Sequence, residues 1–251
     1  MSTTSVLLVV VAFWALRTQK TFHDRLQQHE QENRELKERS LLHSPNGLQI
    51  AYFEHKFIMD ISEIGNDDYV RLNVIQGENK KQVFSGNYQL GFFEWLSDDT
   101  IAVYKNCGTE CMIAYRIDLP TLQTHRFYLG SGYTWSPNNK YVFASLSVPQ
   151  HVITVADAFG NTLFTLRREP LAISNKSVPH KALWSPDSSK LAILIGKENK
   201  EKLELMIFDA EKNFSLLSRH DIDPSSFRDF LWSDYQNIIY HEGDDEKVIH
   251  V

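Results

Sequence analysis

Two cysteines have the clearest potential chemistry in this sequence. Cys107 and Cys111 are the only cysteines in the chain and enclose a short segment that begins with Gly108. A disulfide can join them if the loop brings the two Cα atoms to about 4.4–6.8 Å, and glycine permits the tight bend that this requires. Two free thiols are one alternative. Half of a metal site is the other, with His125 and His151 in the next strands as distant candidates to extend it.

Three further side chains are of the types that act as acids, bases or metal ligands. Glu94, His180 and Asp229 stand one, four and three positions before tryptophans 95, 184 and 232. Because side chains alternate between the two faces of a strand, these unequal offsets send them to different faces or depths. We therefore predict no catalytic, cofactor-binding or metal site, and keep a metal-dependent, lactonase-like hydrolase as an alternative.

Sequence motifs of the common enzyme classes are missing. The sequence contains no Gly-x-Ser-x-Gly, no phosphate-binding loop, no dinucleotide fingerprint and no His-Glu-x-x-His. Carboxylates are paired in predicted turns, where turn formation and solvation explain them better than calcium binding does. These pairs are Asp67-Asp68, Asp98-Asp99 and Asp244-Asp245.

A repeat predicts the elements that position these residues. Trp-Ser-Pro followed by Asp or Asn begins at Trp135 and Trp184, looser copies begin at Trp95 and Trp232, and a copy without tryptophan begins at His43. Proline presets φ in a tight turn, Asp or Asn accepts backbone N–H groups inside it, and strand-forming residues follow. The motif therefore predicts a turn and then a strand. Its predicted structural residues are Ser44, Pro45, Trp95, Ser97, Trp135, Ser136, Pro137, Trp184, Ser185, Pro186, Asp187, Trp232 and Ser233.

The spacing of the repeat predicts the fold class. Successive motif serines are separated by 53, 39, 49 and 48 residues, within the range of four-stranded propeller blades. Apolar strands that end in Asp118, Asp157 and Asp209 mark a second turn in three of the repeats. Four short strands per repeat predict an all-β fold, a β-propeller of about five four-stranded blades over residues 41–251.

The pattern Trp-Ser-Pro-Asp-x-x-Lys-Leu-Ala at Trp184 resembles the repeat of the TolB-like propellers. The same repeat builds the propeller of dipeptidyl-peptidase-type and prolyl-oligopeptidase-type enzymes, and the resemblance covers roughly residues 41–251. It implies a propeller without the hydrolase domain, because the nucleophile motif of that domain is missing. The His-Gly and Trp-Asp signatures of the WD-repeat proteins are missing too.

The two ends of the repeat region raise the question of ring closure. The fifth blade stops at residues 247–251, before an outer strand, and the first begins at Leu41-Leu42 with little room for an inner strand. Either five blades close with imperfect edges, or the arc is open and a second protomer or a partner covers the edges.

The N-terminal segment predicts a membrane anchor over residues 1–17. Val6 to Leu16 is an unbroken apolar run that Arg17 closes. The uncharged stretch is shorter than the roughly 20 residues of a full span, but it lacks the basic start and small-residue cleavage site of a signal peptide. A cleaved signal peptide and a buried helix are the alternatives.

Residues 18–40 predict a helical stalk, because they lack Gly and Pro and are rich in Gln, Glu, Arg and Lys. A parallel coiled coil, with Asn33 setting its register, would make the chain a homo-oligomer; a solvated spacer is the alternative. The seam of that coiled coil would be Phe22, Leu26, His29, Asn33, Leu36 and Ser40.

Signals for location disagree. Arg17, Lys20 and Arg25 follow the anchor, which by the positive-inside rule would keep the repeats in the cytoplasm. A disulfide at Cys107 and Cys111 would need an oxidising compartment. We predict an extracytoplasmic propeller, with a cytoplasmic one as the alternative. The net charge of −6 argues against a nucleic-acid surface.

The function predicted from these features is protein binding. Propellers present loops on a rigid scaffold, and aromatic side chains in such loops anchor interfaces. We therefore predict a membrane-anchored, non-enzymatic binding or scaffolding module without a cofactor. A regulatory subunit of a separately encoded hydrolase is a further alternative. The aromatic candidates are Phe57, Tyr69, Tyr88, Tyr128, Phe159 and Tyr235.

Overall fold

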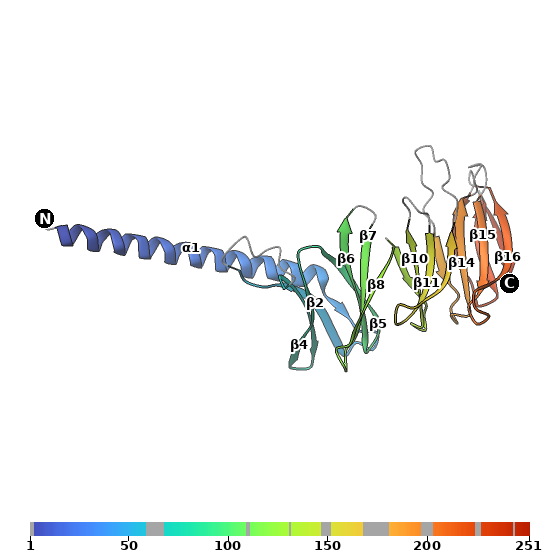
Figure 1. Ribbon diagram of the computed structural model, residues 1–251, viewed down its shortest axis with the longest axis horizontal. Helices are drawn as coiled ribbons and strands as arrows, with labels where there is room; N and C mark the ends of the chain where they lie inside the picture. The colour runs from blue at the N-terminus through green and yellow to red at the C-terminus, as the bar shows by residue number, and fades with distance from the viewer. Residues whose placement is uncertain are drawn as a thin grey trace. The chain divides into compact units, whose positions relative to one another are not determined.

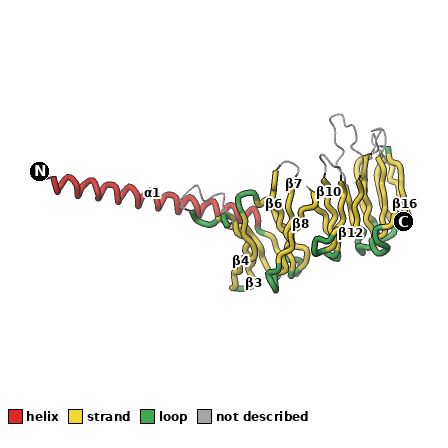
Figure 2. The backbone as a smooth tube through the Cα atoms, in the orientation of Figure 1, coloured by secondary structure: helices red, strands yellow, loops and turns green. Residues whose placement is uncertain are grey.

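The computed structural model describes most of the chain as one helix and nineteen strands (Figures 1 and 2). It divides into two units, residues 1–98 and residues 99–251, which are treated separately below. For residues 3–18 the backbone alone is described. The described residues are 3–58, 68–108, 111–130, 132–146, 152–167, 181–196, 203–223, 227–242 and 244–251.

The first unit consists of a long helix, a four-stranded antiparallel sheet in the order β1-β2-β3-β4, and a further strand, β5. Helix α1 runs without a break from Thr3 to Ser40. Within the part of the chain that the structure describes, no helix combines the length and apolar content needed to cross a membrane. The strands are β1 (Leu42–His43), β2 (Gln49–His55), β3 (Val70–Gln76), β4 (Asn79–Gly86) and β5 (Leu90–Ser97).

The second unit contains the remaining fourteen strands, paired antiparallel in chain order. The first group is β6 (Thr100–Gly108), β7 (Cys111–Asp118) and β8 (Thr124–Gly130). A four-stranded sheet contains β9 (Gly132–Trp135), β10 (Tyr141–Leu146), β11 (Val152–Asp157) and β12 (Thr162–Arg167). Another contains β13 (Lys181–Trp184), β14 (Lys190–Gly196), β15 (Leu203–Asp209) and β16 (Ser215–Ile222). The last has three strands, β17 (Phe227–Trp232), β18 (Asn237–Glu242) and β19 (Asp245–His250).

The predicted repetition of four-stranded sheets is confirmed. The described strands form four sheets of four strands and one of three, and the three-stranded sheet is the last, as residues 247–251 predict. The first sheet begins with a strand of two residues, β1, which agrees with the little room predicted for an inner strand there. Closure of the ring stays a prediction.

The repeat motif forms the same hairpin turn in three copies. In the copy at Ser185, the Ser188 N–H donates to the Ser185 carbonyl at 2.8 Å, and Ser188 takes a φ of 64°. Gly47 and Asn139 hold the same left-handed position, with φ of 73° and 57°. This is a type I turn followed by a left-handed residue, and proline occupies its second position. The prolines are Pro45, Pro137 and Pro186.

The motif serine is buried and fully used inside the turn. Its hydroxyl at Ser185 donates to Asp187 Oδ1 at 2.6 Å and accepts the Lys190 N–H at 2.9 Å. A buried hydroxyl needs both kinds of partner, and these bonds hold the hairpin turn closed. Ser44 and Ser136 are buried in the same way and make the equivalent bonds.

The motif tryptophans of the second unit connect neighbouring sheets. Trp184 Nε1 donates to the carbonyl of Thr134, and Trp232 Nε1 donates to the carbonyl of Leu183, both at 3.0 Å. Each acceptor residue directly precedes the motif tryptophan of the preceding repeat. The indole therefore occupies the space between two sheets and also pairs a backbone carbonyl of the inner strand.

The other two motif tryptophans follow or modify this rule. Trp95 donates to the carbonyl of Leu42 at 3.2 Å within the first unit, one position before the motif residue His43. Trp135 donates instead to the hydroxyl of the buried Tyr104, at 2.8 Å.

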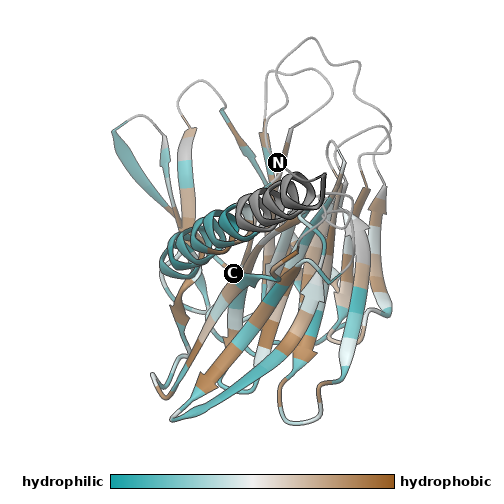
Figure 3. Ribbon diagram, turned by 90° about the vertical axis from the view of Figure 1, so that its left-hand side faces the viewer, coloured by the Kyte–Doolittle hydropathy of each residue, from teal (hydrophilic) through white to brown (hydrophobic). Residues whose placement is uncertain are grey.

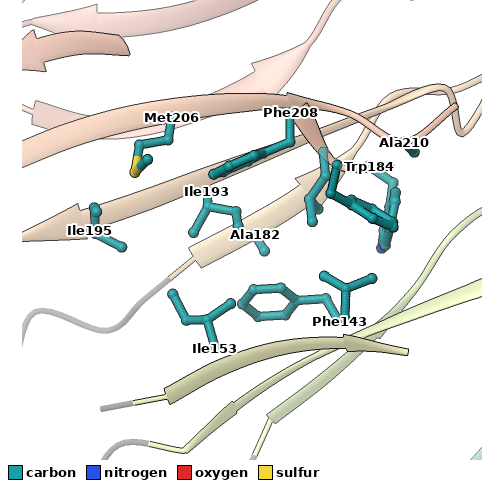
Figure 4. Packing of buried hydrophobic residues seen from close by; sticks show 12 residues of the cluster. Phe143, Ile153, Ala182, Trp184, Ile193, Ile195, Met206, Phe208 and Ala210 are labelled. Atoms are coloured by element: carbon teal, nitrogen blue, oxygen red, sulfur yellow. The ribbon is translucent and has the colours of Figure 1, made fainter. Parts of the chain in front are cut away.

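Two cores of the second unit lie on the two faces of the sheet β13–β16. On one face Ile193 and Phe208 meet Phe143 and Ile153 of the preceding sheet (Figure 4). On the other face Leu194, Leu205 and Ile207 pack with residues of β17–β19. Because both faces are covered, β14 and β15 are almost continuously apolar, as in a fully buried strand.

Trp184→Phe tests the connection between sheets. Phenylalanine can still stack on Tyr141, whose ring centroid lies 5.7 Å from that of Trp184, but it has no N–H for the Thr134 carbonyl. We expect a loss of about 1–3 kcal/mol in unfolding free energy, from the unpaired carbonyl and the smaller ring. Urea unfolding measures it, with the exposed Tyr235→Phe as the matched control. Equal midpoints for both variants would contradict the assigned role.

Candidate functional site

The structure joins the two cysteines in a disulfide. Cys107 lies near the end of β6 and Cys111 begins β7, with the Cα atoms 5.1 Å apart, inside the range that a disulfide requires. Gly108, which follows Cys107, has a φ of 137°, a conformation that other residues rarely adopt. With both sulfur atoms bonded, neither free thiols nor thiolate metal ligands are present. Of the distant histidines, His125 contacts the Phe159 ring, whereas His151 lies outside the described residues.

The three candidate acid–base residues are not brought together. Asp229 forms an ion pair with Lys181, the residue at the equivalent position of the preceding inner strand. Burial raises the pKa of Asp229, but the hydrogen bonds from Lys181 and from the Phe230 N–H outweigh it and lower the pKa overall. Glu94 is exposed in the first unit, and His180 lies outside the described residues. Among the residues that the structure describes, no group of three or more His, Cys, Asp or Glu could hold a metal ion.

Carboxylates of the turns serve as hydrogen-bond acceptors. Asp118 accepts the N–H and hydroxyl of Thr121, and these bonds lower its pKa. Asp68 accepts Lys56 at 3.1 Å and Arg71 at 3.3 Å, which lowers its pKa as well. Asp98 accepts the N–H of Asn46 at 2.8 Å. Asp67 lies outside the described residues.

The aromatic candidates divide into packed and exposed groups. Phe57 contacts Phe22 and His29 of helix α1, with centroids 6.0 and 5.1 Å apart, and Tyr69 stacks on His55 at 4.9 Å. Phe57 and Tyr69 are only partly exposed, whereas the exposed group presents its rings to solvent. Its members are Tyr88, Phe159 and Tyr235, which are 61%, 64% and 53% exposed. The side chain of Tyr128 lies outside the described residues.

Helix α1 replaces part of a missing strand at the edge of β2. Strand β1 pairs only with Ile50 and Ala51, so the backbone groups further along β2 need other partners. The Asn33 amide supplies them at His55: its Oδ1 accepts the His55 N–H at 2.6 Å, and its Nδ2 donates to the His55 carbonyl at 3.1 Å. Ser40 Oγ accepts the Phe53 N–H at 2.8 Å. Burial at this contact lowers the pKa of His55.

This contact corrects the coiled-coil prediction. Asn33 does not set the register of a second helix, because both ends of its amide bind the backbone of His55. Between residues 19 and 40 of α1, every predicted seam residue except Phe22 is partly buried. The helix residues outside the seam are all exposed. The described part of the helix is accordingly mostly hydrophilic (Figure 3). A buried stripe of this width can pack against the edge of a sheet or against another helix. The spacing of residues in the sequence does not distinguish these two partners.

Two surfaces remain as candidate binding sites, one in each unit. The first, here called the helix–sheet groove, is an open cavity of about 520 Å³. Its lining residues are Glu30, Asn33, Arg34, Lys37, Tyr52, Glu54 and Lys80. Sequence reasoning missed it because residues of a helix and of two separate strands form it.

The second surface, here called the Leu231 row, consists of Leu231, Ile239 and Val248 on the sheet β17–β19. The three residues are direct cross-strand neighbours, because Leu231 pairs with Ile239 and Ile239 pairs with Val248. Leu231 is 50% and Val248 is 47% exposed. Phe230 and Ile238 on the opposite face of these strands are buried in the core.

Comparison with known proteins finds similar solved structures but no related sequence. No protein-family model and no curated protein sequence matches this chain. Among solved structures, the β-propeller domain of the Trilobed protease from Pyrococcus furiosus is 13% identical with a TM-score of 0.48; the match covers 83% of this chain and 67% of that one. TolB from Acinetobacter baumannii is 17% identical with a TM-score of 0.41, and 83% of this chain and 48% of that one are covered.

Hydrazine synthase from Kuenenia stuttgartiensis is also similar, at 16% identity and a TM-score of 0.47, over 80% of this chain and 54% of that one. This chain spans about half the length of the hydrazine synthase and Dos1 propeller chains that it matches. At such identities the comparison concerns the fold alone. The structures similar to this chain include β-propellers of the TolB and peptidase types, as the repeat predicts.

Asn33→Leu tests the contact between helix and strand. Leucine has a similar size but cannot bind the backbone of His55, whose N–H then lacks its partner. We expect a loss of about 1–3 kcal/mol and faster hydrogen exchange at the amide of His55. Exchange measured by NMR or mass spectrometry reports it. Gln28→Leu, at an exposed position of the same helix, is the control, and unchanged exchange in Asn33→Leu would contradict the contact.

Proposed function

We propose that this chain is a membrane-anchored β-propeller that acts as a non-enzymatic protein-binding or scaffolding module. The observation that carries the proposal is the Leu231 row, in which the exposed Leu231 and Val248 flank the partly exposed Ile239 on one sheet face. The likeness to TolB and to peptidase propellers supports the fold of the module and not its activity.

The geometry of the Leu231 row suits a protein interface. Side chains directly opposite on antiparallel strands lie about 4.5–5.5 Å apart at Cβ, so Leu231, Ile239 and Val248 form one continuous strip. Charged and polar side chains of the same strands, such as Glu246 and His241, lie beside it. An apolar centre with a polar surround is the usual arrangement of a protein-binding patch.

The neighbouring sheet β13–β16 differs from the sheet that carries this strip. The sheet β13–β16 buries apolar residues on both faces, so Leu205 is fully buried and Met206, its neighbour on the opposite face, is almost so. In β17–β19 the apolar pattern also continues on both faces, but one face is left exposed. Such a pattern is expected where a partner supplies the missing cover.

Leu231→Asp tests the proposal. A charge at one end of the strip should weaken partner binding by at least tenfold, because binding would desolvate a carboxylate without a counterion. Copurification of the full-length tagged chain from native membranes, with quantitative mass spectrometry, measures the partners retained. Leu163→Asp, an exposed leucine of β12, is the matched control.

Loss of a specific protein in Leu231→Asp, with retention in Leu163→Asp, would support the proposal. The same partners for both variants, or no stoichiometric protein with the unaltered chain, would overturn it. Circular dichroism and unfolding midpoints of the purified variants show whether a loss comes from misfolding.

The anchor and the extracytoplasmic location belong to the proposal. The apolar run from Val6 to Leu16 supports the anchor, and the disulfide of Cys107 and Cys111 supports an oxidising compartment. Cells are lysed in a denaturant that contains an alkylating reagent and no reductant. Both cysteines should stay unlabelled until a reductant is added. Full labelling without reductant would contradict the extracytoplasmic location.

The metal-dependent hydrolase and the regulatory subunit of a separately encoded hydrolase stay predictions from the sequence. No specific observation among the described residues favours either of them.

A further inference from the structure

We propose that the helix–sheet groove of the first unit binds an acidic segment of a protein partner. It is a second surface, independent of the Leu231 row. The inference rests on the proposed function only in that it takes the partner to be a protein.

The floor of the groove is an unusually polar sheet face. Cross-strand pairing places Tyr52 beside Asn73 and Glu54 beside Arg71, so these side chains share one face of the sheet β1–β4. The opposite face carries Phe53 and other buried apolar residues. A sheet with this alternation covers one face with a core and leaves the other to polar contacts. Tyr52 and Asn73 are themselves buried, so Glu54 and Lys80 are the polar groups of this sheet that line the groove and can contact a ligand.

Some charges of the groove are already compensated. Glu54 Oε2 accepts Lys80 Nζ at 2.6 Å and Asn73 Nδ2 at 3.0 Å. Burial lowers the pKa of Lys80, but its hydrogen bonds with Glu54 and Tyr52 raise it overall, so the ammonium group stays charged. The Asn33 amide is occupied by the backbone of His55. These groups form a fixed wall and leave the recognition of a ligand to the remaining cations.

Arg34 and Lys37 are those cations. They lie one turn apart on helix α1 and are exposed, and within the described parts of the chain the structure gives neither of them an ion pair. Lys37 Nζ lies 4.6 Å from the centroid of the Tyr52 ring, and Lys80 Nζ lies 5.6 Å from the same centroid. Two ammonium groups are thus held over one aromatic ring at the floor of the groove.

The charge of the lining favours an anionic ligand. Three cations, Arg34, Lys37 and Lys80, face two carboxylates, Glu30 and Glu54, although the chain as a whole has a net charge of −6. A guanidinium group binds a carboxylate through two parallel hydrogen bonds, and the neighbouring ammonium adds a second anchoring point. An acidic side chain therefore finds the groups that it requires at Arg34 and Lys37.

The size and the two carboxylates restrict the ligand further. A volume of about 520 Å³ holds a few residues of an extended segment. Glu30 and Glu54 can accept N–H groups of a peptide backbone, and a polyphosphate chain has no such donors. The combination of cations for side chains and acceptors for backbone groups points to an acidic peptide segment.

The test uses the purified full-length chain and a fluorescein-labelled hexaglutamate peptide, with fluorescence anisotropy as the readout. We expect saturable binding that weakens with added salt, and at least a tenfold loss of affinity in Arg34→Glu/Lys37→Glu. Lys20→Glu reverses one charge on the same helix outside the groove and should alter the affinity less than twofold. A hexaglutamine peptide should not bind.

Absence of saturable hexaglutamate binding, or equal affinity of the double variant and Lys20→Glu, would overturn the inference. Circular dichroism of the double variant shows that the helix is retained, and both substituted positions are exposed. The two proposals fail separately. A partner lost in Leu231→Asp but kept in Arg34→Glu/Lys37→Glu would leave the proposed function standing and remove the groove as its site. Hexaglutamate binding without any copurified protein would keep the groove as a binding site and overturn the proposed function.

Discussion

The hydrogen bond from a motif tryptophan to the backbone of the preceding repeat is the interaction on which the rest of the structure depends. A four-stranded sheet cannot bury both of its faces alone, so each repeat needs its neighbour. The indole of Trp184 fills the space between two sheets and also pairs the carbonyl of Thr134. The side chain of Trp184 thus sets the distance between the two sheets and also supplies the hydrogen bond that the inner strand of the preceding sheet needs.

The buried serine gives the tryptophan a fixed position. Its hydroxyl closes the hairpin turn that follows the indole directly in sequence, as the bonds of Ser185 with Asp187 and Lys190 show. Residues five positions after the serine extend the connection between repeats. Within the second unit, Tyr141 stacks on Trp184, and Lys190 donates to the carbonyl of Tyr235. Turn, indole and following strand therefore act as one structural unit.

The polar chemistry of the repeats is used mainly for construction, and the candidate binding surfaces lie where the repetition is interrupted. Strand β1 is too short to cover β2, and Asn33 of helix α1 pairs the exposed backbone there. This arrangement protects a strand edge that would otherwise be open to pairing with another chain. It also sets Arg34 and Lys37 beside a polar sheet face. On the sheet β17–β19, Leu231 and Val248 of the Leu231 row are exposed.

The sequence by itself determined the repeated sheets and their turns, because proline, Asp or Asn, and alternating apolar residues act over a few neighbouring positions. It also indicated the disulfide, since Cys107 and Cys111 are separated by a segment that begins with glycine. It predicted the seam of helix α1 but not the element that the seam contacts, because spacing shows which side of a helix is buried and not against what. The tertiary structure decided that Asn33 binds the backbone of His55, that Asp229 pairs with Lys181, and that Arg34, Lys37 and Lys80 line one groove. Each of these contacts joins residues far apart in the chain, and only the packing of whole strands and helices brings such residues together.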